Sequence, residues 1–135
     1  MLTYKTADKT DTLSITILVE DYCKEHNIVY NPTDIDKSIR SYLHNFKVIL
    51  AEDDGKPVGA ICYTLTNNPY NFNELFGRKM AIFVKSNERN EGVGYTLIHL
   101  AEEDCKKEGA TKFFLSSPKT VKGYKIFETD YVKEL

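Results

Sequence analysis

The sequence predicts a single domain of mixed α+β class over residues 1–135, with elements in the order β-α-α-β-β-β-α-β-α-β. Three observations support this prediction. Several segments place apolar residues at three- and four-residue steps, the pattern of amphipathic helices. Other short segments are apolar or β-branched and are bounded by turn residues, as strands are. The length allows one hydrophobic core and is too short for two.

The first third of the chain predicts one strand and two helices. Residues 2–6 alternate and are typical of a strand. Residues 8–27 fit both a strand alternation and a helical pattern. The helical fit covers the longer window, so we expect a helix with Thr10 or Asp11 as its N-cap. Residues 31–34 read as a break and a cap, and the apolar stripe of a second helix follows them.

A hairpin is expected in the middle of the chain. Residues 46–52 form its first strand, residues 53–56 a turn with Asp-Gly at its centre, and residues 57–65 the returning strand. We expect residues 66–73, which are polar and aromatic, to form a loop. The next strand begins within residues 75–79.

The stretch from residue 82 to residue 109 predicts a strand, a tight loop and a helix. Residues 82–84 form an apolar, partly β-branched run typical of a strand covered on both faces. Polar residues follow up to Asn90. The helical pattern then starts at Val93, and two lysines with Gly109 mark its end.

The C-terminal part predicts three short elements. Residues 112–116 are expected to form a strand. Ser117 and Pro118 suit the cap and first position of a short helix that ends near Thr129. Residues 131–135 are expected to form a last short strand.

The loop before the 93–109 helix has the chemistry of an anion site. The first N–H groups of a helix lack partners inside it, and the peptide dipoles add a partial positive charge there. Gly92 and Gly94 let the backbone approach a phosphate closely, and Arg89 precedes them as a candidate donor to a phosphate oxygen. Residues 89–96 therefore predict a phosphate cradle. The alternative is a strand-to-helix connection that needs glycine only for its turn.

This loop resembles the acetyl-CoA signature of the general N-acetyltransferase (GNAT) superfamily, Arg/Gln-x-x-Gly-x-Gly/Ala. Arg89, Gly92 and Gly94 stand at its three defined positions, and Val84 stands where the signature strand usually ends. Residues 51–65 also resemble the second and third strands of that family. Because the element order agrees as well, the resemblance covers essentially the whole chain. It implies a mixed, mostly antiparallel sheet flanked by helices, with a C-terminus one strand shorter than usual.

The resemblance implies an N-acetyltransferase that moves an acetyl group from acetyl-CoA to a primary amine of a small molecule, a protein lysine or a protein N-terminus. The signature strand would hold the pantetheine arm, and the N–H of Phe83 or Val84 would polarise the thioester carbonyl. The implied acetyl-CoA-binding residues are Ile82, Phe83, Val84, Arg89, Asn90, Glu91, Gly92, Val93, Gly94, Tyr95 and Thr96.

The implied catalytic residues are less regular. Family members often carry a glutamate at the positions of Gly77 and Arg78, so Glu74 is the nearest carboxylate and the candidate base; the alternative is a solvated charge at the strand end. Many members use a tyrosine of the last helix as the acid. Tyr124 lies two residues from that position and is the candidate here, against the alternative that it only packs between helix and sheet.

Two departures from the family keep a second function open. Glu91 would repel a neighbouring pyrophosphate by about 1 kcal/mol if solvated. The usual strand carboxylate is also missing. The alternative is therefore a catalytically inactive acyl-CoA-binding protein, or an assembly or interaction protein of the same fold. The short C-terminus would leave a sheet edge exposed, and we expect a homodimer or another partner to use that edge.

Composition excludes other classes. With 18 Lys and Arg against 20 Asp and Glu, the chain lacks the basic excess of a nucleic-acid binder. No apolar run approaches the roughly 20 residues of a membrane span. The three histidines show no metal-ligand spacing, so we expect no metal. Cys23, Cys62 and Cys105 are widely spaced and predict reduced thiols in a cytoplasmic protein.

Overall fold

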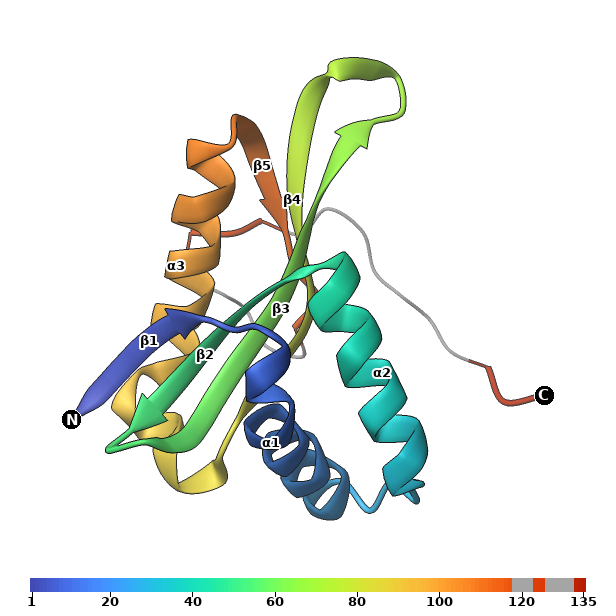
Figure 1. Ribbon diagram of the computed structural model, residues 1–135. Helices are drawn as coiled ribbons and strands as arrows, with labels where there is room; N and C mark the ends of the chain where they lie inside the picture. Colours follow the sequence, from blue (N-terminus) through green and yellow to red (C-terminus); the bar gives the residue numbers. More distant parts are fainter. Residues whose placement is uncertain (118–122, 126–132) are drawn as a thin grey trace.

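The computed structural model describes residues 1–117, 123–125 and 133–135. Its centre is a five-stranded sheet with the strands in chain order (Figure 1). The first three pairings are antiparallel and the fourth is parallel, which confirms the predicted mixed α+β class. The strands are β1 (Leu2–Thr6), β2 (Lys47–Asp53), β3 (Lys56–Asn68), β4 (Asn71–Val84) and β5 (Ala110–Phe114).

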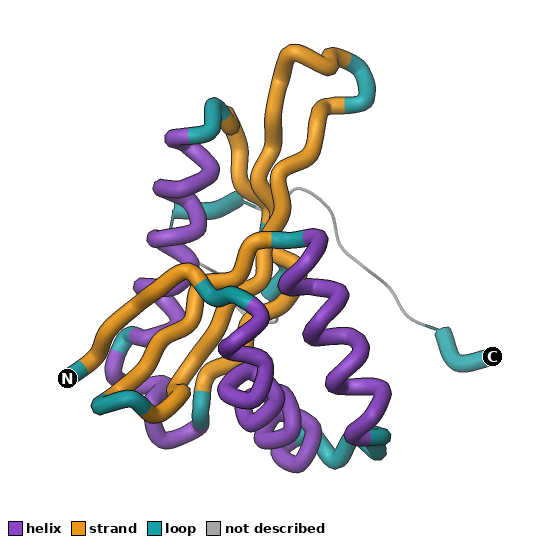
Figure 2. The backbone as a smooth tube through the Cα atoms, viewed as in Figure 1, coloured by secondary structure: helices purple, strands orange, loops and turns teal. Residues whose placement is uncertain are grey.

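Helices cover both faces of the sheet (Figure 2). On one face, α1 (Thr12–Glu25) and α2 (Pro32–Asn45) enclose one group of buried apolar side chains. On the other face, α3 (Val93–Lys107) covers a second group. Two short 3₁₀ helices, η1 (Lys9–Asp11) and η2 (Ser86–Glu91), lead into α1 and α3. No helix in the described ranges is long and apolar enough to cross a lipid bilayer.

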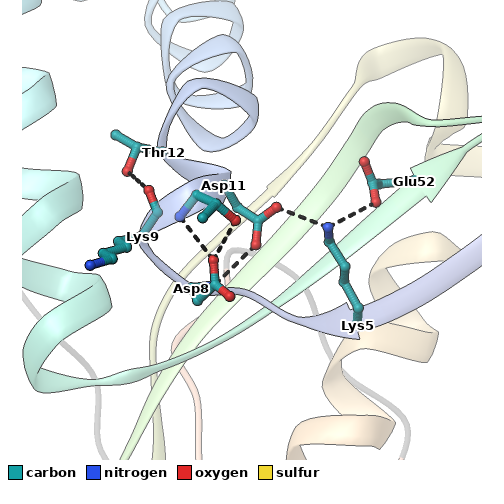
Figure 3. Close-up of polar contacts among 7 residues, drawn as sticks. Lys5, Asp8, Lys9, Asp11, Thr12 and Glu52 are labelled. Carbon is teal, nitrogen blue, oxygen red and sulfur yellow. Dashed lines mark hydrogen bonds and ion pairs between the residues drawn. The ribbon is translucent and has the colours of Figure 1, made fainter.

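The start of α1 is tied to the sheet by a cluster of charged side chains (Figure 3). Asp11 stands at the N-cap position of α1 but does not cap it; its Oδ2 accepts from the backbone N–H of Asp8 at 3.0 Å. Asp8 in turn accepts from the backbone N–H of Thr10 at 2.8 Å, so the residue whose side chain caps this turn is Asp8. The Lys5 ammonium lies 2.9 Å from the buried Asp11 carboxylate and 3.5 Å from Glu52. These contacts join α1 to β1 and β2.

The turn between β2 and β3 has the predicted chemistry. Asp54 and Gly55 both have positive φ, 50° and 82°, as the two central residues of a type I′ turn require. Asp tolerates this region better than most residues and Gly adopts it without strain.

The loop predicted at residues 66–73 is wrong, because β3 and β4 continue through it as one long hairpin that projects from the sheet (Figure 1). Asn67 and Asn68 are the last two residues of β3, and their side chains connect it to β4. Asn67 Nδ2 donates to the carbonyl of Phe72 at 2.7 Å, and Asn68 Nδ2 donates to Glu74 Oε1 at 2.8 Å. Side chains typical of turns therefore stabilise strand pairing here.

Two glycines allow α3 to pack directly on the sheet. A Cβ at Gly59 of β3 would lie 2.9 Å from Val93 Cγ1, and a Cβ at Gly77 of β4 would lie 2.7 Å from Cys105 Sγ. Both distances are shorter than real Cβ contacts. Gly59 thus sets the position of the first turn of α3, and Gly77 sets that of its last turns.

The C-terminal predictions have different outcomes. The strand expected at residues 112–116 begins two residues earlier, as β5. The helix expected from Ser117 to Thr129 and the strand expected at 131–135 fall largely outside the described residues. The homodimer through the C-terminal edge stays a prediction.

Candidate functional site

The site begins where β4 and β5 part. In the described residues, β5 pairs with β4 only along Leu75–Arg78, whereas β4 continues to Val84 in pairing with β3. Just beyond the shared segment, Met80 is an extra residue between Lys79 and Ala81, which pair with adjacent residues of β3. Such a bulge bends a strand and increases its twist. The last residues of β4 therefore have an edge that β5 does not cover.

The N-terminus of α3 has the geometry of an anion site. Gly92 has φ 76°, a left-handed conformation that strains other residues. In the described part of the chain no side chain caps α3, unlike α2, whose start an asparagine side chain caps. Thr96 N–H donates to the Gly92 carbonyl at 3.0 Å and so has a helical partner. Val93, Gly94 and Tyr95 are the first residues of α3, and the N–H groups at the start of an α-helix have no acceptor within that helix. This cradle suits a pyrophosphate.

The structure brings the cradle and the strand end together. A Cβ at Gly94 would lie 3.5 Å from Val84 Cγ2 and 4.0 Å from Ile82 Cδ1, both ordinary contacts. The α3 start therefore packs on the last residues of β4. Phe83 points to the opposite face, where its ring packs edge-on against Tyr22 with centroids 5.3 Å apart.

The residues between strand and helix form η2, a short 3₁₀ helix, where the sequence predicts a tight loop. The side chains of Arg89, Asn90 and Glu91 lie outside the described part of the structure. Their predicted contacts with a nucleotide therefore stay predictions.

Lys79 lies beside the site and makes a contact that the sequence did not predict. Its Nζ donates to the carbonyl of Ser116, which follows β5, so it spans the two strands where they begin to part. Burial lowers the pKa of Lys79. No local pattern indicates this contact, because the two residues meet only through the parallel pairing of β4 and β5.

Tyr124 lies against α3. Its hydroxyl donates to Glu102 Oε2. Burial, reinforced by this carboxylate, raises the pKa of Tyr124 well above its ordinary value. The phenol is therefore protonated at neutral pH, and its proton points to Glu102.

Glu74 is not brought to the cradle. It lies near the start of β4, nine residues and about 30 Å of strand from Phe83. Its carboxylate accepts from Asn68 and from Thr111 Oγ1 at 2.9 Å, and these hydrogen bonds lower its pKa. A lowered pKa makes a weaker base, and the contacts close the hairpin and connect it to β5.

A cavity of about 350 Å³ lies on the other face of the sheet, between α1, α2 and the last part of β4. Ala60 and Cys62 of β3 and Ala81 and Phe83 of β4 form its floor. Burial raises the pKa of the Cys62 thiol to about 11, so it is neutral at physiological pH. The cavity and the cradle therefore lie on opposite faces of the same strand. No group of residues suited to hold a metal ion occurs in the described ranges.

Comparison with known proteins gives the same architecture. The sequence matches the Acetyltransferase (GNAT) family over residues 15–125, and no curated protein sequence matches the chain. A ribosomal-protein-alanine N-acetyltransferase from Brucella melitensis biovar Abortus 2308 superposes with a TM-score of 0.79 at 16% identity, covering 100% of this chain and 99% of that one.

Two further structures share the fold. An aminoglycoside acetyltransferase from an uncultured soil metagenomic sample, in complex with sisomicin, has a TM-score of 0.72 at 15% identity, with 98% and 97% coverage. A predicted acetyltransferase with acetyl-CoA from Clostridium acetobutylicum has a TM-score of 0.75 at 16% identity, with 100% and 96% coverage. The family match covers most of the sequence and the structural likeness covers nearly all of it. The chain belongs to the GNAT acetyltransferase family.

Proposed function

We propose that the protein is an acetyl-CoA-dependent N-acetyltransferase that acetylates a primary amine. The observation that carries this proposal is the uncapped start of α3, packed on an end of β4 that β5 leaves uncovered. Together they provide a diphosphate cradle continuous with a strand edge. A nucleotide with an extended arm needs both.

Each part of the site then has a role. The N–H groups of Val93, Gly94 and Tyr95, with Arg89, would hold the pyrophosphate. The part of β4 beyond its pairing with β5 would hold the pantetheine arm by backbone hydrogen bonds. The Lys85 N–H donates to the Val58 carbonyl of β3, and in this antiparallel register the N–H of Phe83 also faces β3, so Phe83 is not the predicted donor to the acyl carbonyl oxygen. Acetyl-CoA supplies an activated acetyl group as a thioester. The protein itself orients the amine and moves its protons.

The proton donor in this proposal is Tyr124. Because its phenol is protonated at neutral pH, it has a proton to give, but the proton is directed at Glu102. Donation to a leaving thiolate would require the phenol to exchange that partner. The contacts of Glu74 favour a structural role, and the amine would lose its first proton to water or to another base.

A matched pair of substitutions at Gly94 tests the cradle. Gly94→Ala adds a Cβ that fits against Val84 and Ile82, so CoA should still bind. Gly94→Asp adds a carboxylate beside the amide donors and should abolish CoA binding, as measured by isothermal titration calorimetry. Arg89→Ala should weaken binding by about 1.5–3 kcal/mol. Tight CoA binding by the Asp variant would refute the placement of the cradle.

Release of free thiol from acetyl-CoA, followed with a panel of primary amines, tests the activity. Amine-dependent release supports the transferase. CoA binding without thiol release for any amine would favour the alternative, an inactive acyl-CoA-binding protein of this fold. The distance between Glu74 and the cradle supports that alternative. If the protein neither binds CoA nor releases thiol, the remaining interpretation is an interaction module.

A further inference from the structure

The cavity between α1, α2 and β4 has an apolar interior and an apolar mouth. Ile35, Ile39 and Val48 in its wall are each less than 10% exposed. At its mouth, Val29 is 99% exposed and Tyr42 is 42% exposed. Large apolar side chains that are this exposed beside a hollow favour an apolar occupant.

The polar groups around the cavity are mostly engaged by the protein itself. Tyr30 Oη donates to Glu20 Oε2 at 3.1 Å. Asn31 Oδ1 accepts from the backbone N–H groups of Thr33 and Asp34 at the start of α2. These two groups are therefore already paired within the protein, and a ligand hydroxyl placed against the apolar interior would lose water, which is unfavourable.

One charged side chain lines the cavity in the described part of the chain. Of the described residues that line it, Asp34 is the only charged one, and it is exposed at the start of α2. One carboxylate at this position attracts a singly charged amine as it enters the cavity. A polycation would need more acidic groups to replace its hydration.

The cavity also reaches the strand assigned to the thioester. Its floor includes Ala81 and Phe83, which flank Ile82 on the uncovered part of β4. The edge of a sheet is accessible from both of its faces. A molecule seated in the cavity therefore lies against the strand that would hold the thioester.

We propose that this cavity is the acceptor site, and that its acceptor is a small primary amine with an apolar, aliphatic or aromatic body and one positive charge. The inference rests on the proposed function. The amine nitrogen forms an amide bond to the acetyl carbon in place of the carbon–sulfur bond. Of the two protons that the ammonium gives up, one ends on the CoA thiol and the other on water. The cavity is unsuited to a polyhydroxylated aminosugar.

Thiol release from acetyl-CoA with three amines tests the substrate class. The kcat/KM for 2-phenylethylamine should exceed that for glucosamine and that for spermidine at least about tenfold, because only the first has an apolar body and a single charge. Equal or higher values for glucosamine or spermidine, with CoA bound normally, would overturn the acceptor class and leave the transferase proposal intact. Failure of the protein to bind CoA would refute both.

Two identical substitutions on α2 test the location. Ser38 lines the cavity, whereas Ser41 is exposed on the same helix and does not. Ser38→Trp should raise the KM for 2-phenylethylamine at least about tenfold by filling the cavity, with CoA affinity unchanged. Ser41→Trp should leave both constants unchanged. Calorimetric titration of 2-phenylethylamine without acetyl-CoA should show the same difference between the variants. Equal amine binding by the two would overturn the assignment.

Discussion

Replacing Gly59 by alanine should weaken CoA binding through a change in packing, without replacing any residue of the cradle. The new Cβ would lie 2.9 Å from Val93 Cγ1, 3.1 Å from Leu97 Cδ1 and 3.2 Å from the carbonyl of Phe83. The contact with Val93 is about 0.5 Å short of ordinary van der Waals separation. Because Val93 and Leu97 are fully buried, the first turns of α3 must move away from the sheet.

The magnitude follows from two opposing effects. Overpacking a core costs about 1–3 kcal/mol. Replacing glycine within a strand regains about 0.5–1 kcal/mol. Urea unfolding should therefore show a net loss of about 1 kcal/mol. CoA affinity, measured by calorimetry on the folded variant, should fall about fivefold, since one weakened amide hydrogen bond accounts for roughly 1 kcal/mol.

Gly77→Ala is the matched control. Its Cβ would lie 2.7 Å from both Cys105 Sγ and Phe113 Cδ1, under the other end of α3. It should reduce stability by at least as much as the Gly59 variant but leave CoA affinity unchanged. If both variants lost CoA affinity equally, or if Gly59→Ala retained full stability, the role of close packing in placing the cradle would be refuted.

Three further predictions concern the fold. Tyr63→Phe should cost about 1–2 kcal/mol in urea unfolding, because the buried Tyr63 hydroxyl donates to Asp104 Oδ2 at 2.7 Å; an unchanged midpoint would contradict this. Burial alone would raise the pKa of Asp104, but hydrogen bonds from Lys47 and Tyr63 outweigh it and lower the pKa below its ordinary value of 3.8. The resulting stabilisation is complete above pH 3.8 and is lost as the pH falls through the lower pKa of the folded state. The free energy of unfolding should therefore fall less at acid pH in Asp104→Asn than in the unsubstituted protein. Asn31→Ala should reduce the free energy of unfolding by about 1 kcal/mol, because it removes the side chain that caps α2. Thermal unfolding followed by the loss of helicity measures this, and a midpoint equal to that of the unsubstituted protein would refute the role of the cap.

Much of the fold follows from local patterns. The stripe that includes Ile35 and Ile39 identifies α2, and Asn31 identifies its start. Asp54 and Gly55 identify the turn between β2 and β3, because few residues adopt positive φ. The prediction fails at residues 66–73, where asparagine side chains stabilise strands by contacts across the hairpin. Their sequence alone is equally typical of a loop.

The candidate site divides in the same way. Gly92 and Gly94, between a strand and an amphipathic helix, indicate an anion site from sequence, since the donors are backbone groups of adjacent residues. Lys79 and its partner Ser116 are 37 positions apart and were missed. Glu74 was predicted as the base because it is near Gly77 and Arg78 in sequence. In an extended strand each residue adds about 3.3 Å, so Glu74 lies far from the cradle.

By itself, the sequence determined the class of fold, the order of most elements and the place of the cradle. These depend on hydrophobic periodicity, turn conformation and helix-end chemistry, which act over a few neighbouring residues. Only the tertiary structure decided where β4 leaves β5, how closely α3 approaches the sheet over Gly59 and Gly77, and where the cavity between α1, α2 and β4 lies. Those features depend on how distant segments pack, and packing is a property of the surfaces that meet.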